Sequence, residues 1–513
     1  MKFLDCTLRD GGYYTNWDFN QHVVDNYLMA IDKLPVDCIE VGYRSLSKSE
    51  YAGQYFYCPV PTLMHIKQLA PHKKVAIMFN EKDILPEDAI RLLKPIEGLV
   101  DIIRLAVQPE RFEQAVLLAA TIKKMGFLVG INLMYMSKVL KNTSVLEKLP
   151  IMKGHVDYFS LVDSYGGVYP DDVRKTVRKV KSLIDIELGF HGHNNLELAL
   201  INSITAIEEG CTWVDGTITG MGRGAGNLKT ELFLTWMANK KNIQIDFNRL
   251  ADVVGLFDLL QKEYGWGTNL PYMVSGANSL PQKDVMDWLT KRTYSMNSII
   301  QALQNKQSGS QDNLKFPLLS IKEKYQNALL IAGGPSTIEH AEAIRYWINK
   351  NSKNVVLIHV SSRNISPFSD LDVPQIYCLV GNEGRRLEKA FVNSSFIDSI
   401  AVLPPFPRKM GTYIPDFLNK LTYELDVVSF TDKFQDAHTA ISLQTAINLE
   451  VEKIFCVGFD GYSGTLIGEK EQDLLKENDY LFKKIEEVGF LINSLTPTKY
   501  SSLIEYSIYD LIS

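Results

Sequence analysis

The chain has 513 residues, of which 46% are hydrophobic and 22% charged, and its formal net charge is -6. This length exceeds what one hydrophobic core normally spans, so we expect two globular domains. No block of Lys and Arg is long enough to follow a phosphate backbone, which argues against a nucleic-acid partner. No apolar run reaches membrane-spanning length and the N-terminus has no apolar signal core, so we expect a cytoplasmic protein with no membrane partner.

The cysteines are scattered and form no CxxC pair. This pattern favours reduced, mostly buried thiols and argues against a cysteine zinc site. The six cysteines are Cys6, Cys38, Cys58, Cys211, Cys378 and Cys456.

Up to about residue 228, short runs rich in Val, Ile and Leu alternate regularly with longer amphipathic stretches. Eight such runs with helical stretches between them are typical of parallel βαβ units, and eight strands close a (β/α)8 TIM barrel. A doubly wound open sheet would also alternate, but it rarely keeps eight units in a row. The predicted strands are residues 3–8, 38–42, 74–79, 102–107, 127–133, 158–162, 187–193 and 213–219.

The rest of the chain divides at a polar stretch. Residues 229–305 are predicted to be mostly helical and to extend the barrel domain, residues 1–303. Residues 304–318 form the predicted linker, because QNKQSGSQDNLK has no apolar period. Residues 319–513 predict a second, Rossmann-like α/β domain, with strands in NALLIAGGPS, VVLIHVSS, QIYCLVGN, IDSIAVLP, LDVVSFT and KIFCVGFDGYSG.

The motif HGHNN ends the seventh predicted strand. Side chains two apart on a strand share a face, so His191 and His193 project together. Two hydrogen-bonded core histidines are the alternative. At the C-terminal mouth of a barrel, however, paired imidazoles are well placed to bind a divalent cation, and we favour a metal site.

The motif TLRDGG, after the first strand, supplies an anionic partner in Asp10, and the following Gly11 and Gly12 are expected to let the backbone turn sharply. Only strand eight separates strands one and seven in a closed barrel, so Asp10 can reach the same ion. This ligand set suits Mn²⁺ or Mg²⁺ first, with Co²⁺ and Zn²⁺ as alternatives. Arg9 can neutralise an enolate oxygen, or it forms a structural salt bridge.

A glycine-rich loop, DGTITGMGRGAGNLKTE, follows the eighth strand. Its alternating glycines, which include Gly222 and Gly224, allow close approach to a ligand, and Asn227 is expected at the start of the next helix. A simple barrel-closing loop is the alternative.

Together, TLRDG, HxHNN and the glycine loop ending in GN resemble the DRE-type metallolyase superfamily of TIM barrels, over roughly residues 1–300. That group includes 4-hydroxy-2-oxovalerate aldolase, hydroxymethylglutaryl-CoA lyase and the isopropylmalate and homocitrate synthases. The resemblance implies that Asp10, His191 and His193 are metal ligands and that Asn227 lies at or near the metal. It also implies that Arg9 stabilises an enolate.

Departures from the family patterns favour the oxovalerate aldolases. Claisen-type synthases carry an acid soon after RDG, where this chain has Gly12 and Tyr13, and the hydroxymethylglutaryl-CoA lyases carry a cysteine in the glycine loop, whereas Cys211 lies upstream of it. The aldolases have a histidine three residues after the metal aspartate, where this chain has Tyr13; the next histidine is His22. Tyr13 is therefore either a proton relay or a lid aromatic.

The resemblance extends to further residues. Tyr272, in LPYMVSG, resembles a tyrosine that assists the aldolases, and Ser164, in VDSYGG, resembles an active-site serine. The expected catalytic residues are thus Arg9, Tyr13 and Tyr272, and the expected substrate contacts are Arg9, Ser164, Gly222 and Gly224.

The function implied is a carbon–carbon lyase in which the metal chelates a 2-oxo acid and retro-aldol cleavage leaves a pyruvate enolate. The expected partners are a small 2-oxo acid and an aldehyde, and a homodimer is expected as well. The aldehyde is sugar-like or nucleotide-linked, as in surface-glycan biosynthesis. The alternatives are a catabolic 4-hydroxy-2-oxovalerate aldolase with a structural second domain, a Claisen-type acyl-CoA lyase or synthase, and a non-catalytic binding protein.

In the second domain, the order of strand, Gly-rich turn and helix at ALLIAGGPSTIEHAEAI is typical of a phosphate-cradling turn, although GGPS lacks the GxGxxG spacing. With VGFDGYSG, which places Asp460 after a strand, it loosely resembles nucleotide-sugar-binding domains of glycan enzymes. A nucleotide-sugar is therefore an expected partner, and a purely scaffolding domain is the alternative.

Overall fold

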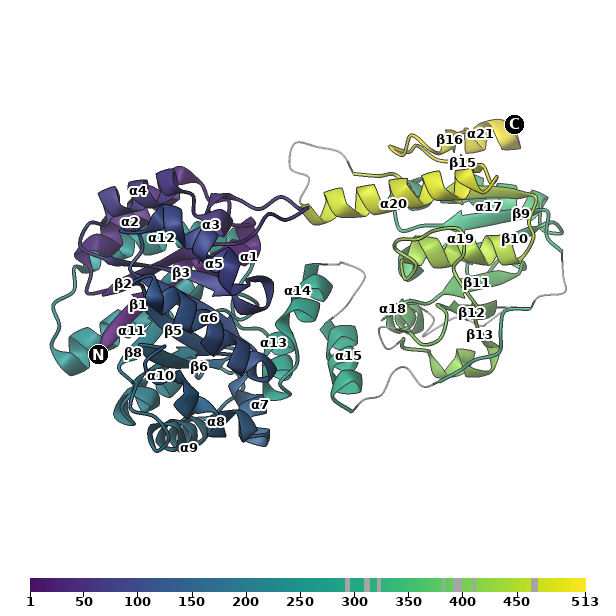
Figure 1. Cartoon of the computed structure of the whole chain (residues 1–513). Coiled ribbons are helices and arrows are strands. Elements are labelled where there is room, and N and C mark those ends of the chain that lie inside the picture. Colours follow the sequence, from purple (N-terminus) through teal and green to yellow (C-terminus); the bar gives the residue numbers. More distant parts are fainter. Residues whose placement is uncertain are drawn as a thin grey trace. The chain divides into compact units, whose positions relative to one another are not determined.

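The computed structural model describes residues 1–290, 296–308, 314–320, 324–381, 383–390, 399–408, 412–462 and 469–513 (Figure 1). The chain forms two compact units, Met1–Met286 and Asp287–Ser513. The boundary between the units follows Met286, whereas we predicted from sequence that the barrel domain extends to residue 303. Helix α15 (Met296–Ser308) belongs to the second unit and runs into the predicted linker, of which residues 309–313 lie outside the described residues.

The first unit contains a closed barrel of eight parallel strands in sequence order, which confirms the predicted TIM barrel (Figure 1). The barrel closes where β1 pairs with β8, with Leu4 opposite Asp215. The strands are β1 (Lys2–Asp5), β2 (Cys38–Tyr43), β3 (Lys74–Asn80), β4 (Ile102–Val107), β5 (Leu128–Leu133), β6 (Tyr158–Asp163), β7 (Glu187–Gly192) and β8 (Trp213–Gly216).

Most of the helices cover the outside of the barrel and bury apolar stripes against it. In α6, for example, Ala115, Leu118 and Ile122 recur at helical spacing and are buried. The helices are α1 (Thr7–Thr15), α2 (Gln21–Lys33), α3 (Gln54–Tyr57), α4 (Val60–Leu69), α5 (Pro86–Leu93), α6 (Phe112–Lys124), α7 (Met136–Lys141), α8 (Ser144–Glu147), α9 (Pro170–Lys181), α10 (Ala199–Glu208), α11 (Thr230–Lys241), α12 (Phe247–Tyr264), α13 (Leu270–Ala277) and α14 (Gln282–Thr290).

The inside of the barrel is layered. An apolar cluster that includes Cys38, Ile102 and Trp213 fills the amino-terminal end of the strands. Two residues further along the same strands, and so on the same face, lie Glu40, Arg104 and Asp215, all buried. The polar layer therefore begins inside the strands and leads to the mouth at their carboxyl ends.

The first strand is shorter than predicted. It ends at Asp5, and TLRDGG opens helix α1, so the expected strand to residue 8 and the expected sharp turn at the glycines are wrong. The glycines serve close packing instead. A Cβ on Gly11 would lie 2.5 Å from the sulfur of Met221, and one on Gly12 would lie 2.1 Å from the Trp17 ring.

The second unit is a three-layer α/β domain, which confirms the Rossmann-like prediction. Its sheet is parallel and has the order β13-β12-β11-β10-β9-β14-β15-β16. Helix α17 packs on one face and helices α19 and α20 on the other. The strands are β9 (Asn327–Ile331), β10 (Val355–His359), β11 (Gln375–Cys378), β12 (Ser399–Leu403), β13 (Thr422–Glu424), β14 (Lys453–Val457), β15 (Ile492–Ser494) and β16 (Ile504–Glu505).

One predicted strand of this unit is wrong. LDVVSFT, residues 425–431, follows β13 as irregular chain, and its Leu425, Val428 and Phe430 pack into the core from there. The spacing of apolar residues, on which we based the prediction, does not distinguish a loop that packs into the core from a strand. The helices of this unit besides α15 are α16 (Ser336–Glu339), α17 (Ala341–Lys350), α18 (Glu383–Ala390), α19 (His438–Asn448), α20 (Glu469–Glu487) and α21 (Ile508–Ile512).

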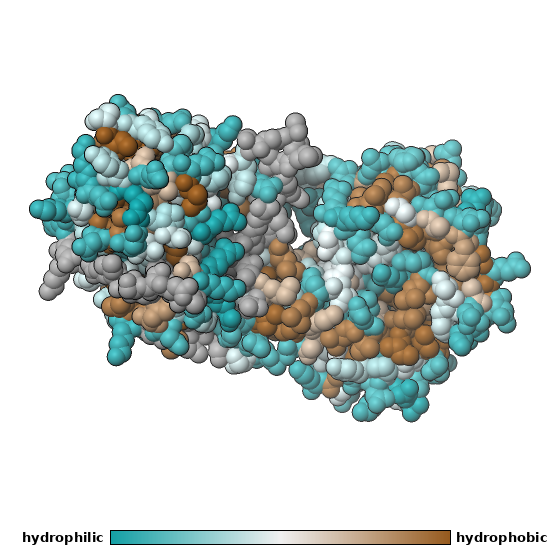
Figure 2. Space-filling model, turned by 180° about the vertical axis from the view of Figure 1, so that it is seen from behind, coloured by the Kyte–Doolittle hydropathy of each residue, from teal (hydrophilic) through white to brown (hydrophobic). Residues whose placement is uncertain are grey.

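The surface in Figure 2 is mixed, with hydrophilic residues covering most of the face shown and hydrophobic areas between them. Among the described residues, no helix combines the length and the apolar character needed to cross a bilayer. All six cysteines are buried and free of disulfides, as predicted.

Candidate metal centre and substrate cavity

A cavity of about 440 Å³ opens at the carboxyl ends of the barrel strands, where TIM-barrel active sites lie. Its wall contains most of the residues that the sequence motifs singled out. Those that line it are Arg9, Asp10, Tyr13, Ser164, His191 and His193.

Three predicted metal ligands converge in this cavity. Asp10 comes from α1, His191 from β7 and His193 from directly behind β7, and one ligand atom of each lies within 4.8 Å of the others. His191 Nε2 is 3.7 Å from Asp10 Oδ2. All three side chains are buried. This convergence is what a shared cation requires.

Both imidazoles are held in the orientation that a metal ligand needs. His191 Nδ1 lies 3.0 Å from an Asp215 oxygen, and His193 Nδ1 lies 2.8 Å from the Asp163 carbonyl oxygen. Each Nδ1–H can donate there, which leaves Nε2 with its lone pair for an ion. Burial, together with His191, lowers the pKa of His193 to about 3, so this ring is neutral at pH 7.

Asn227 completes the group. Its Nδ2 donates to Asp10 Oδ2 at 2.6 Å and to the Met221 carbonyl, whereas its buried Oδ1 has no hydrogen-bond partner among the described residues. Contrary to our expectation, Asn227 does not begin a helix. It forms an isolated β-bridge with His193 before α11 starts at Thr230. An orphaned amide oxygen on a residue that is bonded to Asp10 and bridged to His193 fits a divalent cation.

Arg9 is fixed from two sides. Its Nη1 donates to Asp10 and its Nε donates to Glu40, each at 2.7 Å. Burial raises the pKa of Asp10, but Arg9, His191 and His193 outweigh this effect and lower it to about 2. The Asp10 carboxylate is therefore anionic across the physiological range, as a metal ligand would have to be.

The sequence reasoning missed the residues that connect this group. Arg104 lies 3.3 Å from Glu40, which also binds Arg9, and donates to Asp215, which contacts His191. The missed signal was a charged residue in the middle of an apolar strand, as in IIRLAV and WVDG. A buried charge requires a partner, so such residues indicate a buried ionic network.

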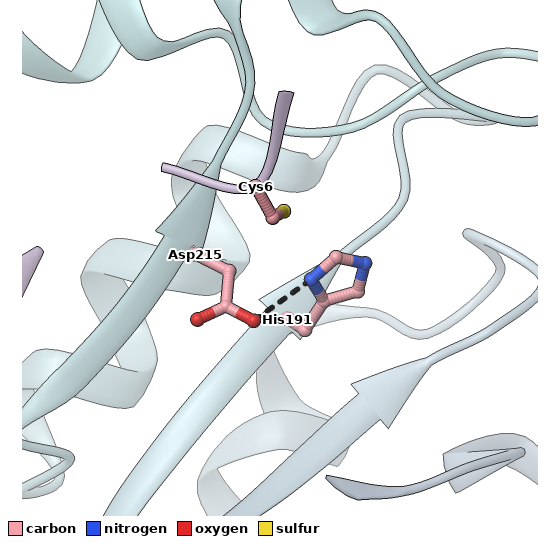
Figure 3. Close-up of side chains that lie close together, drawn as sticks. All are labelled: Cys6, His191 and Asp215. Atoms are coloured by element: carbon pink, nitrogen blue, oxygen red, sulfur yellow. Dashed lines mark hydrogen bonds and ion pairs between the residues drawn. The ribbon is translucent and has the colours of Figure 1, made fainter. Parts of the chain in front are cut away.

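Cys6 lies beside His191 and Asp215, and these three side chains could also surround an ion (Figure 3). The Cys6 thiol, however, points to the Gly216 carbonyl at 3.5 Å, and burial raises its pKa well above the usual range. Asp215 is already paired with Arg104. This second group therefore orients His191 rather than holding a metal.

Two further predicted residues line the cavity. The Tyr13 hydroxyl is 2.9 Å from the Tyr43 hydroxyl, and the Arg223 guanidinium lies 4.2 Å from the centre of the Tyr13 ring. Ser164 Oγ accepts a hydrogen bond from the Tyr135 amide at 2.8 Å, which fixes the serine at the wall.

The other predicted residues lie behind the wall. Tyr272 is buried on α13, and a Cβ on Gly224 would be 3.0 Å from its ring. A Cβ on Gly222 would meet Asn227 at 2.4 Å and Asp10 at 3.3 Å. The absence of a side chain at Gly222 therefore leaves room for Asn227 and Asp10. Tyr272 packs against the glycine-rich loop at Gly224.

Arg223, from GMGRGAGN, was also missed by the sequence reasoning. It lines the cavity, and its guanidinium has no ion pair among the described residues. Three exposed lysines line the same cavity, likewise without an ion pair in the part of the chain that the structure describes: Lys48, Lys82 and Lys283. The wall therefore carries these four cationic side chains without an ion pair among the residues described, together with the acids Asp10 and Asp83.

Comparisons with known proteins agree with this geometry. A family model described as HMGL-like matches residues 108–256. The chain is 31% identical over 289 residues to 4-hydroxy-2-oxovalerate aldolase of Thermomicrobium roseum, covering 56% of this chain and 76% of that protein. It is 30% identical over 262 residues to the enzyme of the same name from Brevibacillus brevis, covering 49% and 74%.

A solved structure extends the likeness to three dimensions. The N-terminal domain of a proposed aldolase from Bacteroides vulgatus is 53% identical, with a TM-score of 0.56, and the match covers 59% of this chain and 100% of that one. The barrel and its site thus define a carbon–carbon lyase of the aldolase type. The chain belongs to the HMGL-like family, the DRE-type metallolyase barrels.

Proposed function

We propose that the barrel is a divalent-metal-dependent aldolase that cleaves or forms 4-hydroxy-2-oxo acids by way of a pyruvate enolate. The observation that carries this proposal is the convergence of Asp10, His191 and His193 at the mouth of a barrel whose relatives are named as 4-hydroxy-2-oxovalerate aldolases. Mn²⁺ or Mg²⁺ fits this oxygen and nitrogen set, and Co²⁺ and Zn²⁺ are compatible with it.

Asp10, His191 and His193 would hold the ion, with Asn227 Oδ1 beside them. When bound, the ion supplies Lewis acidity to a 2-oxo acid and stabilises negative charge on its keto oxygen. The chain's own contribution is a set of fixed charges. Arg9 keeps further N–H groups for the developing enolate oxygen after bonding Asp10 and Glu40.

Arg223 and Ser164 are our candidates for the substrate carboxylate. A guanidinium can donate two parallel hydrogen bonds to a carboxylate, and Arg223 lines the cavity without an ion pair among the described residues. Ser164 adds a hydroxyl whose position is set by the Tyr135 amide. Together with Arg9, these residues would orient the 2-oxo acid before bond cleavage.

Cleavage requires removal of the 4-hydroxyl proton, and Tyr13 is our candidate for the group that takes it. Arg223 lies over its ring, and the Tyr43 hydroxyl lies within hydrogen-bond distance of its oxygen. Tyr272, which lies behind Gly224, would act by supporting the loop.

The lysines of the wall favour an anionic aldehyde. Lys48, Lys82 and Lys283 have no acidic partner among the described residues and would complement a phosphate or carboxylate on the second substrate. A sugar-like or nucleotide-linked aldehyde, used in glycan biosynthesis, meets this requirement. Acetaldehyde, the uncharged substrate of a catabolic enzyme with a structural second domain, does not.

The decisive test is exchange of the pyruvate methyl protons for deuterium, followed by NMR with and without added Mn²⁺, because it needs no knowledge of the aldehyde. We expect metal-dependent exchange that Asp10→Asn and His191→Ala abolish together with metal binding. His22→Ala, which removes an exposed histidine, is the matched control. Full exchange by either site variant after chelation would refute the metal assignment. No exchange at all would favour a non-catalytic binding protein.

The aldehyde is tested by condensing pyruvate with acetaldehyde or with glyceraldehyde 3-phosphate. We expect kcat/KM to be at least ~10-fold higher for the phosphorylated aldehyde than for acetaldehyde. This ratio corresponds to the free energy of one charged hydrogen bond. Lys82→Ala should reduce that preference, and the surface variant Lys240→Ala should not. Equal rates would favour the catabolic enzyme, and activity only with acyl-CoA would favour a Claisen-type reaction.

We also propose a homodimer. Leu232 on α11, with Phe247 and Leu259 on α12, are large apolar side chains that are exposed in the single chain. Burial of such residues is a common source of stable self-association. Light scattering that gives the mass of one chain would contradict this proposal.

A further inference from the structure

The second unit has its own cavity, of about 530 Å³, at the carboxyl ends of β9, β10 and β14. The sheet order reverses here: β10 lies on one side of β9 and β14 on the other. In open parallel sheets, ligands bind at such a topological switch point. We infer that this cavity binds a nucleoside phosphate, with the phosphate at the glycine turn after β9. The inference concerns the second unit and does not depend on the activity of the barrel.

The turn after β9 is built without side chains. A Cβ on Gly334 would lie 2.4 Å from the Gly458 carbonyl oxygen and 2.7 Å from the Asp460 carboxyl carbon. On Gly333, a Cβ would face Ser361 Oγ at 3.4 Å and Arg363 Cδ at 3.6 Å. The fold requires glycine at 334, because any side chain there would collide with neighbouring atoms. At Gly333 the absence of a side chain leaves the backbone accessible to a ligand, beside Arg363.

Side-chain hydrogen bonds hold the turn in place. The Asp460 carboxylate accepts hydrogen bonds from the Ser336 amide, at 2.9 Å, and from its hydroxyl. Asn364 Nδ2 donates to the Gly334 carbonyl at 2.9 Å. A turn fixed in this way is preorganised for a ligand, since no loop must be ordered on binding.

Arg363 supplies the positive charge. Its side chain is exposed beside Gly333, and its guanidinium has no hydrogen bond or ion pair within the described ranges. The nearby acids are occupied: Glu383 accepts from the Ser362 amide at 2.5 Å and pairs with Arg386 at 3.3 Å, and Asp460 holds the turn. An unpaired guanidinium next to open backbone is the complement of a phosphate.

Other residues of the lining suit a sugar and a base. His438 Nε2 lies 3.8 Å from Glu383 Oε2 and has no hydrogen-bond partner among the described residues, and Tyr462 is 36% exposed at the cavity. Asn478, which links Thr439 to the Tyr500 hydroxyl, adds an ordered polar surface. Hydrogen-bonding groups for hydroxyls and an aromatic face for a ring extend the site beyond phosphate alone.

The test is calorimetric titration of the metal-free full-length chain with nucleoside mono- and diphosphates of each base, with UDP-glucose and CMP-sialic acid, and with inorganic phosphate. Chelation keeps the nucleotides from binding through a metal at the barrel site. We expect saturable binding of at least one nucleotide, at least ~10-fold tighter than that of phosphate, or ~1.4 kcal/mol. Tighter binding of a sugar conjugate than of its parent nucleotide would identify a nucleotide-sugar as the ligand.

Arg363→Ala should weaken that binding at least ~10-fold, as loss of a charged hydrogen bond predicts. Arg385→Ala is the matched control, because that arginine lies over the Tyr413 ring and does not line the cavity. Gly333→Trp, which would fill the turn, tests the same site by obstruction. Absence of nucleotide binding, equal affinity for inorganic phosphate, or affinity unchanged in Arg363→Ala with its fold intact would overturn the inference.

Discussion

Four buried charges beside the candidate metal ligands form a chain in which the sign alternates. Arg9 bridges Asp10 and Glu40, and Arg104 bridges Glu40 and Asp215. An unpaired buried charge would cost several kcal/mol, so this alternation makes the polar layer compatible with the barrel core. The same bonds fix the direction in which His191 and Arg9 point.

Asp215→Asn tests this positioning. Loss of the carboxylate behind His191 should weaken metal binding ~10–100-fold, the usual effect of removing an outer-shell partner. Calorimetric titration with Mn²⁺ measures the effect, and circular dichroism reports whether the fold is intact. Asp185→Asn, at an exposed site, is the control. Unchanged affinity in a folded Asp215→Asn protein would contradict the role.

Arg223→Ala tests the carboxylate contact. We expect the KM for pyruvate in the exchange reaction to rise ~10–100-fold, the range of a lost charged hydrogen bond, with a smaller change in metal affinity. Arg223→Lys should recover part of the loss, because it restores the charge without the planar fork. A KM unchanged in Arg223→Ala would remove this arginine from the substrate site.

At the scale of elements, parallel strands place chemistry at their carboxyl ends and structural polar groups within them. His359, on β10, is an example of the second kind. It is buried, stacks on the Tyr377 ring with centroids 4.7 Å apart, and its Nε2 lies 2.8 Å from Gln375 Oε1. Burial lowers its pKa from 6.5 to about 4.

This shift predicts acid sensitivity of the second unit. As pH falls, His359 is protonated in the unfolded chain before it is protonated in the folded one. The free energy of unfolding is therefore highest above pH 6.5 and decreases between pH 6.5 and about pH 4. The loss amounts to about 3 kcal/mol at most. Urea unfolding of the full chain at pH 7 and pH 5 measures it. His359→Gln should flatten this dependence and His340→Gln, which removes a partly buried histidine, is the control. An equally steep dependence in His359→Gln would contradict the assignment.

At the scale of the whole molecule, the two units have separate hydrophobic cores. A ligand stabilises only the unit that binds it. Mn²⁺ at 100 times its dissociation constant should add ~2.7 kcal/mol to the barrel and raise its unfolding temperature by ~5–10 °C. We expect calorimetry to show two transitions, of which chelation lowers one. A common shift of both transitions would contradict independent unfolding.

The sequence by itself was sufficient for the barrel, for the second α/β unit and for three side chains that converge at the barrel mouth, Asp10, His191 and His193. Strand and helix periods are local, and HGHNN and TLRDGG each lie within a few residues of a strand end. Predictions from local sequence were wrong where tertiary packing determines the backbone conformation. TLRDGG, predicted as a strand end and turn, is helical, and LDVVSFT, predicted as a strand, packs into the core as irregular chain.

Only the tertiary structure decided which polar residues meet. Arg104 and Asp215 are 111 residues apart along the chain, and Asn227 and Asp10 are 217 apart. The cavity of the second unit likewise depends on β14 returning to the far side of β9. Such contacts are set by barrel closure and sheet order, which no local spacing contains.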